Sequence, residues 1–415
     1  MKIIALDVHR TFAQVAILEN GKIRDAGRLE LEREHILKFA KRLNVEDEIV
    51  LEATVNTKAI VRLLSPHVNR VVISNPLLVR AIAWAKVKTD KIDASVLAKL
   101  HASGFLPEVW MPDEETERLR RVVAERVQLV SQMTRLKNRI HSVLHANLIP
   151  PFSGSLFSKR GRAWLEALPV AEDQQRVILR HASELDRLGH DLKQIDEDLA
   201  QAALQEPRVK QLMTITGVNM VVALSVLAAV GDIGRFSSPE KLVSYFGLNP
   251  RVRQSGDKPA YHGRITKQGR SHARAMLVEA AWSVSRTPGP LRAFFQRIKE
   301  KRGNQVAAVA TARKLTVVIW HMLSKGEEYI WSRPALLDWK LRKLELAAGY
   351  PSKRGGRTKG SAADYSLKSV RDREREAVGH AEEVYRRFVT KWKQRSPMAN
   401  PVSHQYVNQK KELRT

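Results

Sequence analysis

The run KTDKID at residues 88–93 opens a predicted helix, and its two aspartates, Asp90 and Asp93, decide how the N-terminal region is interpreted. Carboxylates at positions i and i+3 of a helix share one face, about 5–6 Å apart at Cβ. Such a pair is common in the first turn of a helix, where the helix dipole favours acids. It also suits a divalent cation if further carboxylates lie close by. The spacing alone favours an ordinary first turn, so the interpretation depends on acids found upstream.

The segment before this helix predicts an α/β domain at residues 1–105. Asn20-Gly21 supplies a hairpin turn between two β-forming runs, because both residues tolerate positive φ. The predicted strands are 3–8, 11–18, 22–31, 48–52 and 70–74, and the predicted helices are 32–43, 58–64 and the helix that carries Asp90. The order is therefore β-β-β-α-β-α-β-α.

Two acids stand within these otherwise apolar strands. Asp7 lies between Leu6 and Val8, and Glu52 ends the fourth strand. With the two aspartates of the helix they make four carboxylates, a donor set that suits Mg²⁺ or Mn²⁺. Such ions can activate an attacking oxygen and stabilise a leaving one in phosphodiester chemistry. This order of elements resembles the RNase H-like fold of the Holliday-junction resolvase (RuvC) type.

Composition restricts the class of protein and its partners. The chain has 415 residues, 43% of them hydrophobic and none of them cysteine, so it is long enough for several domains without disulfides or thiolate metal sites. We expect a cytoplasmic protein, because no signal peptide or long apolar span is recognised. The formal net charge of +27 points to a polyanion such as nucleic acid rather than to a membrane.

The middle of the chain, residues 113–205, predicts two long helices. Apolar residues recur at 3-4 spacing from Leu119 to Val143 and again from Ile178 to Ala202, with Arg126 the polar exception in the first seam. Sustained seams of this kind are typical of coiled coils. The pairing is either antiparallel within the chain or between two chains, and the sequence leaves both open.

The region that follows, residues 206–348, predicts a mostly helical domain that contains a strongly basic segment. Residues 251–302 hold 13 Lys and Arg against 3 Asp and Glu, with glycines that let a backbone approach phosphates. Ser255 and Gly256 lie in a predicted loop, where they are most simply turn residues. The candidate nucleic-acid contacts are Arg251, Arg253, Gly256, Lys258, Arg264, Lys267, Arg270 and Arg274. After Pro351 we expect a basic tail (residues 349–415), with a charged helix at 369–395 and a disordered end.

Both halves together resemble the DEDD transposases that use a catalytic serine, a bridge-RNA-guided insertion-sequence family that includes the Piv-type DNA invertases. The N-terminal resemblance rests on ALDVH (5–9), LEA (51–53) and KTDKIDA (88–94). The C-terminal resemblance rests on GLNP (247–250), QSG (254–256), KQG (267–269) and Arg274. It covers about residues 1–330, so the tail lies outside it.

The resemblance implies a RuvC-like domain, a helical coiled coil and a serine-bearing transposase domain, in that order. It implies that Asp7, Glu52, Asp90 and Asp93 hold Mg²⁺ (or Mn²⁺), and that Ser255 attacks DNA to form a transient phosphoserine link. It further implies target and donor DNA and a structured guide RNA as partners, in a nucleoid-associated protein. We hypothesise a homodimer or homotetramer with a site assembled between protomers.

Two other classes stay open at this point. One is a metal-dependent nuclease or junction resolvase without serine catalysis, and the other is a nucleic-acid-binding protein without activity. A covalent protein–DNA adduct would separate the transposase from the first, and Mg²⁺-dependent nicking would exclude the second.

Overall fold

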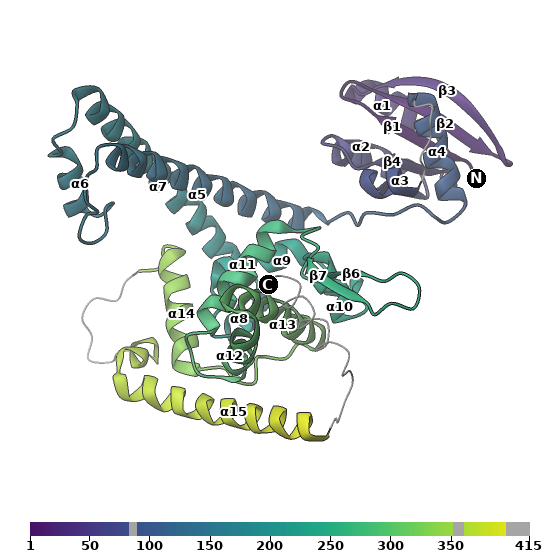
Figure 1. The fold of residues 1–415 in the computed structure, drawn as a ribbon. Helices are drawn as coiled ribbons and strands as arrows, with labels where there is room; N and C mark the ends of the chain where they lie inside the picture. Colours follow the sequence, from purple (N-terminus) through teal and green to yellow (C-terminus); the bar gives the residue numbers. More distant parts are fainter. Residues whose placement is uncertain (83–88, 352–360, 396–415) are drawn as a thin grey trace, which may run out of the picture. The chain divides into compact units, whose positions relative to one another are not determined.

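The computed structural model describes residues 1–82, 89–351 and 361–395. The chain folds into two units, Met1–Pro112 and Asp113–Thr415, hereafter unit 1 and unit 2 (Figure 1). Unit 1 is a mixed α/β layer structure and unit 2 is mostly helical, as the sequence predicts.

Unit 1 is built on a five-stranded sheet in the order β3-β2-β1-β4-β5. Its strands are β1 (Ile3–Val8), β2 (Phe12–Glu19), β3 (Lys22–Glu30), β4 (Glu48–Glu52) and β5 (Arg70–Ser74), each within one residue of its predicted limits. The first three form an antiparallel meander, whereas β4 and β5 run parallel to β1. The helices are α1 (Arg33–Ala40), α2 (Thr57–Leu64), η1 (Ser65–His67), α3 (Pro76–Ile82) and α4 (Asp90–Ala102).

The two faces of this sheet are covered by different helices, because strand residues alternate in direction. Ile4 and Leu6 of β1 pack with residues of α1 and α2 on one face. Ile3 and Ala5 pack on the opposite face with Leu97 of α4 and with α3. Odd-numbered residues of β1 therefore point toward α4. One helix was expected after β5, the one that carries Asp90, and the structure has two. Lys88 of the KTDKID run lies outside the described residues.

Two long helices open unit 2, as the seams predict: α5 (Glu114–Ala146) and α7 (Glu172–Gln205). They pack against each other within the chain, and the short helix α6 (Lys159–Glu166) lies at their connected end (Figure 1). The polar seam residue Arg126 is paired in this hairpin, because its Nε lies 2.5 Å from Oδ1 of Asp196. Packing of the two helices within one chain leaves the oligomeric state as a prediction.

The remaining helices surround a core to which the ends of α5 and α7 also contribute. They are α8 (Pro207–Met213), α9 (Met220–Val230), η2 (Ile233–Arg235), α10 (Pro239–Tyr245), α11 (Ser271–Val284), α12 (Pro290–Arg302), α13 (Asn304–Lys325) and α14 (Pro334–Ala347). Among the described helices, α13 alone is long and apolar enough to cross a bilayer, and half of that apolar stretch is buried in unit 2.

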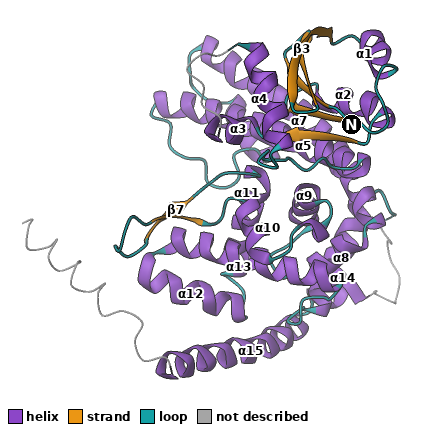
Figure 2. Cartoon of the chain, turned by 90° about the vertical axis from the view of Figure 1, so that its right-hand side faces the viewer, coloured by secondary structure: helices purple, strands orange, loops and turns teal. Residues whose placement is uncertain are grey.

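A two-stranded hairpin interrupts these helices, and the sequence analysis did not predict it. Strands β6 (Pro250–Arg253) and β7 (Tyr261–Ile265) pair antiparallel, and their connecting loop carries Ser255 (Figure 2). Both strands are short, with four residues in β6 and five in β7, and neither presents a continuous apolar face, so no strand pattern stands out in the sequence.

Part of the C-terminal tail is docked on unit 2. The helix expected at 369–395 is α15 (Lys368–Arg395), preceded by η3 (Ser361–Ser366). Buried Glu382 accepts hydrogen bonds from the Gly289 backbone N–H and from Nε of Arg292, both at 2.9 Å. The tail helix is thereby attached to the start of α12. Residues 352–360 and 396–415, the second of which include the expected disordered end, lie outside the described residues.

Candidate active site

Asp7 and Glu52 meet at the carboxyl ends of two parallel strands. The β1–β4 register pairs Ile3 with Glu48 and runs to Leu6 opposite Leu51, so the next residues on each strand are Asp7 and Glu52. Neighbouring residues in such a register point to the same face, about 4.8 Å apart. Asp7 lies on the face covered by α4, and both acids are half-buried.

The first turn of α4 brings the other two acids to this face. Thr89 caps the helix, because its side chain accepts from the Ile92 backbone N–H at 3.4 Å. Asp90 is therefore the first helical residue and Asp93 follows on the same side. Since α4 packs on β1 and β2, its N-terminal turn lies beside the strand that carries Asp7.

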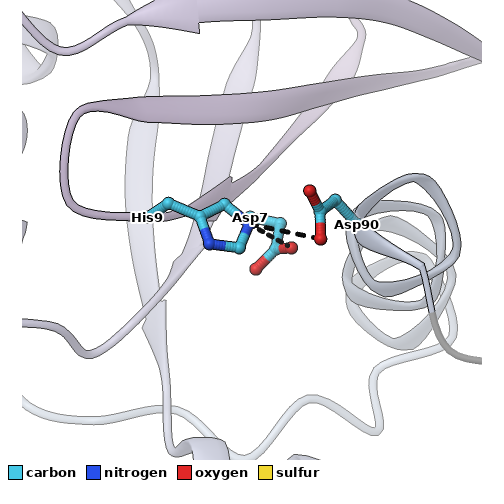
Figure 3. Close-up of side chains that lie close together, drawn as sticks. All are labelled: Asp7, His9 and Asp90. Carbon is cyan, nitrogen blue, oxygen red and sulfur yellow. Dashed lines mark ion pairs between the residues drawn. The ribbon is translucent and has the colours of Figure 1, made fainter.

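A histidine lies between two of these carboxylates. Nε2 of His9 is 3.4 Å from Oδ2 of Asp7 and 3.4 Å from Oδ1 of Asp90 (Figure 3). One ligand atom from each of the three residues lies within 4.8 Å of the others. Glu52 and Asp93 lie outside this group of three. The structure thus brings Asp7 and Asp90 together around His9, with the other two predicted acids in the adjoining positions of β4 and α4.

The surroundings of Asp7 shift the pKa of its carboxyl group. Burial raises the pKa of Asp7, and the neighbouring Asp93 and Asp90 raise it further, against an opposing effect of His9. Half-buried carboxylates that repel one another are stabilised by a shared cation. The charge distribution therefore favours a positive ligand at this point.

The donor set fits a divalent ion. Two carboxylate oxygens and one imidazole nitrogen converge, and neighbouring ligands of an octahedral ion lie about 3 Å apart, opposite ones about 4.2 Å. The separations around His9 fall in this range. An ion held here would activate an attacking oxygen and stabilise a leaving oxygen at phosphorus.

His9 and a supporting network were not among the predicted site residues, although His9 is part of the ALDVH motif. His9 stands two residues after Asp7, so the alternation of a strand could have indicated that both share a face. The network joins β2, β3 and α4: Gln14 Nε2 donates to Asp25 at 2.5 Å, and Asp25 pairs with Lys91 at 2.7 Å. Because Lys91 follows Asp90, this network holds the first turn of α4 near β2.

Ser255 lies in unit 2, in the exposed loop of the β6–β7 hairpin. Gly256, which follows it, has φ +57°, a left-handed conformation that turns the chain directly after the serine. Within the described residues, no hydrogen bond or ion pair reaches the Ser255 side chain. The hydroxyl is thus accessible, and an activating group would come from outside its immediate surroundings.

The predicted nucleic-acid contacts fall into two sets. Arg251, Arg253, Lys258 and Arg264 are exposed on the hairpin and its loop, close in sequence to Ser255. The others lie at the base of the hairpin: Nε of Arg270 donates to the Tyr245 hydroxyl at 2.9 Å, and Arg274 donates to the Phe246 carbonyl at 2.8 Å. Lys267 has φ +59° in the turn that closes this base.

Two glycine-containing turns clamp the base of the hairpin. The backbone N–H groups of Thr266 and Lys267 donate to the carbonyls of Asn249 and Gly247, at 2.9 and 3.1 Å. A Cβ at Gly247 would lie 2.0 Å from the Gln268 carbonyl oxygen, and one at Gly269 would lie 2.1 Å from the Tyr245 oxygen. The motifs GLNP and KQG therefore fix the root of the Ser255 loop by close backbone contact.

Replacing Gly269 by alanine should destabilise this clamp by about 2 kcal/mol or more, because φ is +93° and the new Cβ meets backbone. Faster proteolysis within residues 254–260 and faster hydrogen exchange at the hairpin base would report it. Gly303→Ala is the control when both variants are compared by thermal unfolding of the full chain, since Gly303, between α12 and α13, has φ +81° but nothing within 4 Å of its Cβ position. Equal effects of the two substitutions would show that φ alone, and not the close contact, matters.

Comparisons with known proteins match both regions. Residues 4–148 match a transposase family of the DEDD type, and residues 209–296 match the family described as transposase IS116/IS110/IS902. The chain is 28% identical over 305 residues to y4qE of Sinorhizobium fredii, named a transposase, covering 72% of this chain and 75% of that protein. It is 27% identical over 255 residues to the transposase for insertion sequence element IS1111A of Coxiella burnetii, covering 58% and 68%. It is 26% identical over 269 residues to the pilin gene-inverting protein of Moraxella bovis, covering 63% and 75%. The region that matches the DEDD family, residues 4–148, contains all four predicted acids, and the region that matches the IS116/IS110/IS902 family, residues 209–296, contains Ser255.

Proposed function

Since the chain carries the domains of the IS110/IS116 family of DEDD transposases, enzymes of DNA strand cleavage and transfer, we propose that it moves or inverts a DNA segment with its acidic cluster and Ser255. The observation that carries the proposal is the convergence of Asp7 and Asp90 in the segment that matches the DEDD family. A relative named as an insertion-sequence transposase supports movement of a DNA segment, and one named as a pilin gene-inverting protein supports inversion. The strand order of unit 1 supports an RNase H-like (RuvC-like) fold.

The metal-binding residues in this proposal are Asp7, Glu52, Asp90 and Asp93. They would hold Mg²⁺ or Mn²⁺, and the cluster is partly open to solvent, since 40% of the Asp90 side chain is exposed. Asp7 supplies a more buried carboxylate than Asp90, which is held in place by the Thr89 cap and the Lys91–Asp25 pair. A phosphodiester that reaches the cluster is thus oriented by a fixed set of oxygens.

Ser255 is the nucleophile in this proposal. Its Oγ forms a bond to phosphorus and loses its proton, while one strand oxygen leaves with a proton, so that a phosphoserine ester conserves the bond energy. A DNA hydroxyl then attacks that ester, rejoins the strands and releases the serine. Arg251, Arg253 and Lys258 on the same hairpin stabilise the negative charge that develops on the phosphate oxygens.

The test is the covalent link itself. Ser255→Ala should leave DNA binding intact and abolish a protein–DNA adduct that survives denaturation, because the methyl side chain cannot attack phosphorus. Denaturing gels with labelled substrate DNA would measure it, and Ser271→Ala, exposed in the same basic segment, is the control. An adduct that persists in Ser255→Ala excludes this nucleophile. Metal-dependent nicking by wild type without any adduct would favour the nuclease.

A guide RNA and a homodimer or homotetramer complete the proposal. The net charge of +27 and the exposed cations of the hairpin suit nucleic acid in general and so support the RNA, whereas the oligomer stays a prediction. Sequencing of RNA that co-purifies with the full chain, together with light scattering, would test both. Absence of a defined RNA species from an active preparation would remove the guide from the proposal.

A further inference from the structure

His9 is placed in the acidic cluster by its own strand end and by its neighbours. It follows β1 on the face that Asp7 shares, and its ring stacks on Phe12, with centroids 4.7 Å apart and planes at 27°. The guanidinium of Arg28 lies over the Phe12 ring, 4.3 Å from its centroid. Asn56 donates to the His9 carbonyl at 3.3 Å. Backbone and ring are therefore both held before any ligand binds.

The ring nitrogen that faces the acids has no hydrogen-bond partner among the described residues. Although 38% of the side chain is exposed, Nε2 itself is buried. Its 3.4 Å distances to Asp7 and Asp90 place it between the two carboxylates without hydrogen-bonding geometry to either. A buried nitrogen without a partner costs free energy unless something binds to it. The lone pair of a neutral imidazole at this point is suited to a cation shared with the carboxylates.

We infer that His9 is a nitrogen ligand of the metal site, through Nε2, and that it biases the site toward Mn²⁺ over Mg²⁺. The inference rests on the proposed function, because it assumes that the acids bind a metal. It adds a residue outside the four acids and a preference between the two ions.

The preference follows from ligand chemistry. Mg²⁺ is a hard ion that takes oxygen donors and water, whereas imidazole suits first-row transition metals. Exchanging one oxygen or water for a nitrogen therefore strengthens Mn²⁺ binding and gives little to Mg²⁺. The stacked, anchored ring adds to this effect, because the ligand is already oriented when the ion arrives.

The experiment measures the bound ion rather than catalysis. Untagged full-length protein is loaded with Mn²⁺, and electron spin echo envelope modulation records nitrogen coupled to the ion. We expect a directly bound imidazole ¹⁴N in wild type, and a changed pattern when the histidines carry ¹⁵N. Calorimetry should show that His9→Gln weakens Mn²⁺ about tenfold and Mg²⁺ less than twofold. His35→Gln is the control, since Nδ1 of His35 also lies 3.4 Å from a single carboxylate, that of Glu32.

Each outcome decides between the inference and its premise. A nitrogen signal that is lost in His9→Gln and kept in His35→Gln supports the inference. Mn²⁺ that binds wild type without a nitrogen signal, and is lost in Asp7→Asn, overturns the role of His9 and leaves the acidic site standing. Equal weakening of Mn²⁺ and Mg²⁺ in His9→Gln overturns the preference. If neither His9→Gln nor Asp7→Asn alters Mn²⁺ binding, the metal site itself is overturned. The isotope experiment uses wild-type protein alone. If no histidine nitrogen is bound to Mn²⁺ there, the inference is overturned even when a variant misfolds.

Discussion

Replacing Asp7 by asparagine should reduce metal-dependent DNA strand cleavage by a factor on the order of 10³ or more, because the site loses a carboxylate that is more buried than that of Asp90. Asparagine keeps the shape of the side chain and removes the charge that holds the ion beside Asp90. Cleavage of supercoiled DNA in Mg²⁺ or Mn²⁺, followed on agarose gels, measures the loss.

The melting temperature distinguishes loss of the metal site from misfolding of the variant. Burial and the nearby Asp90 and Asp93 make the charge of Asp7 unfavourable in the metal-free protein. The asparagine variant should therefore melt at the same temperature as the wild type or higher when both are metal-free. Glu34→Gln removes an exposed charge of unit 1 and should retain full cleavage. Cleavage within tenfold of wild type in Asp7→Asn would contradict the assignment of the acids.

Local signals predicted most of unit 1. The strands have apolar alternation, and the Asn20-Gly21 turn has both residues at positive φ, as a two-residue hairpin requires. Their order in the sheet depends on pairing between distant segments, so the meeting of Asp7 with Asp90 could be suspected from the residues but not located. His9 differs in this respect, because its two-residue spacing from Asp7 is a local signal that places both side chains on one face of a strand.

The β6–β7 hairpin and the docking of α15 depend on contacts between segments distant in the sequence, which no local pattern predicts. The β6–β7 hairpin exists because Gly247 and Gly269 bring two backbone segments into contact, and its strands carry exposed arginines. The buried Glu382 of α15 finds its partners about ninety residues earlier. A charged helix beyond the recognised motifs looks like a solvated tail until these partners are known.

Lys340 of α14 is a further case, and its loss should be costly. Its Nζ donates to the carbonyls of Met213, Ile215 and Val218 at 2.7, 2.8 and 2.8 Å, which joins α14 to the turn between α8 and α9. Lys340→Met fills the same space but removes the Nζ donor from three buried carbonyls, of which that of Ile215 keeps the Val218 N–H at 3.0 Å. We expect a loss of about 2–4 kcal/mol in the stability of unit 2. Thermal unfolding and hydrogen exchange of the α8–α9 peptides in the full chain would measure it.

The pH dependence gives this prediction a sign. Burial lowers the pKa of Lys340 to about 7, with a contribution from Arg333, against 10.5 for an unperturbed lysine. Between these values the unfolded chain binds the proton more tightly than the folded one, so wild-type stability rises with pH from about 7 to 10.5. Methionine has no such proton, and the difference between wild type and variant should widen from pH 7 to pH about 9.5.

The control is Lys343→Met, on the same helix but exposed, where the amine lies 3.7 Å from the Trp339 ring centroid. An exposed cation–π contact contributes about 0.5–1 kcal/mol, so this variant should differ little from wild type. A cost for Lys340→Met no larger than that of the control would mean that the three carbonyls find other donors. A difference between Lys340→Met and wild type that stays constant with pH would mean that the ammonium keeps its proton when buried, held by its three acceptors.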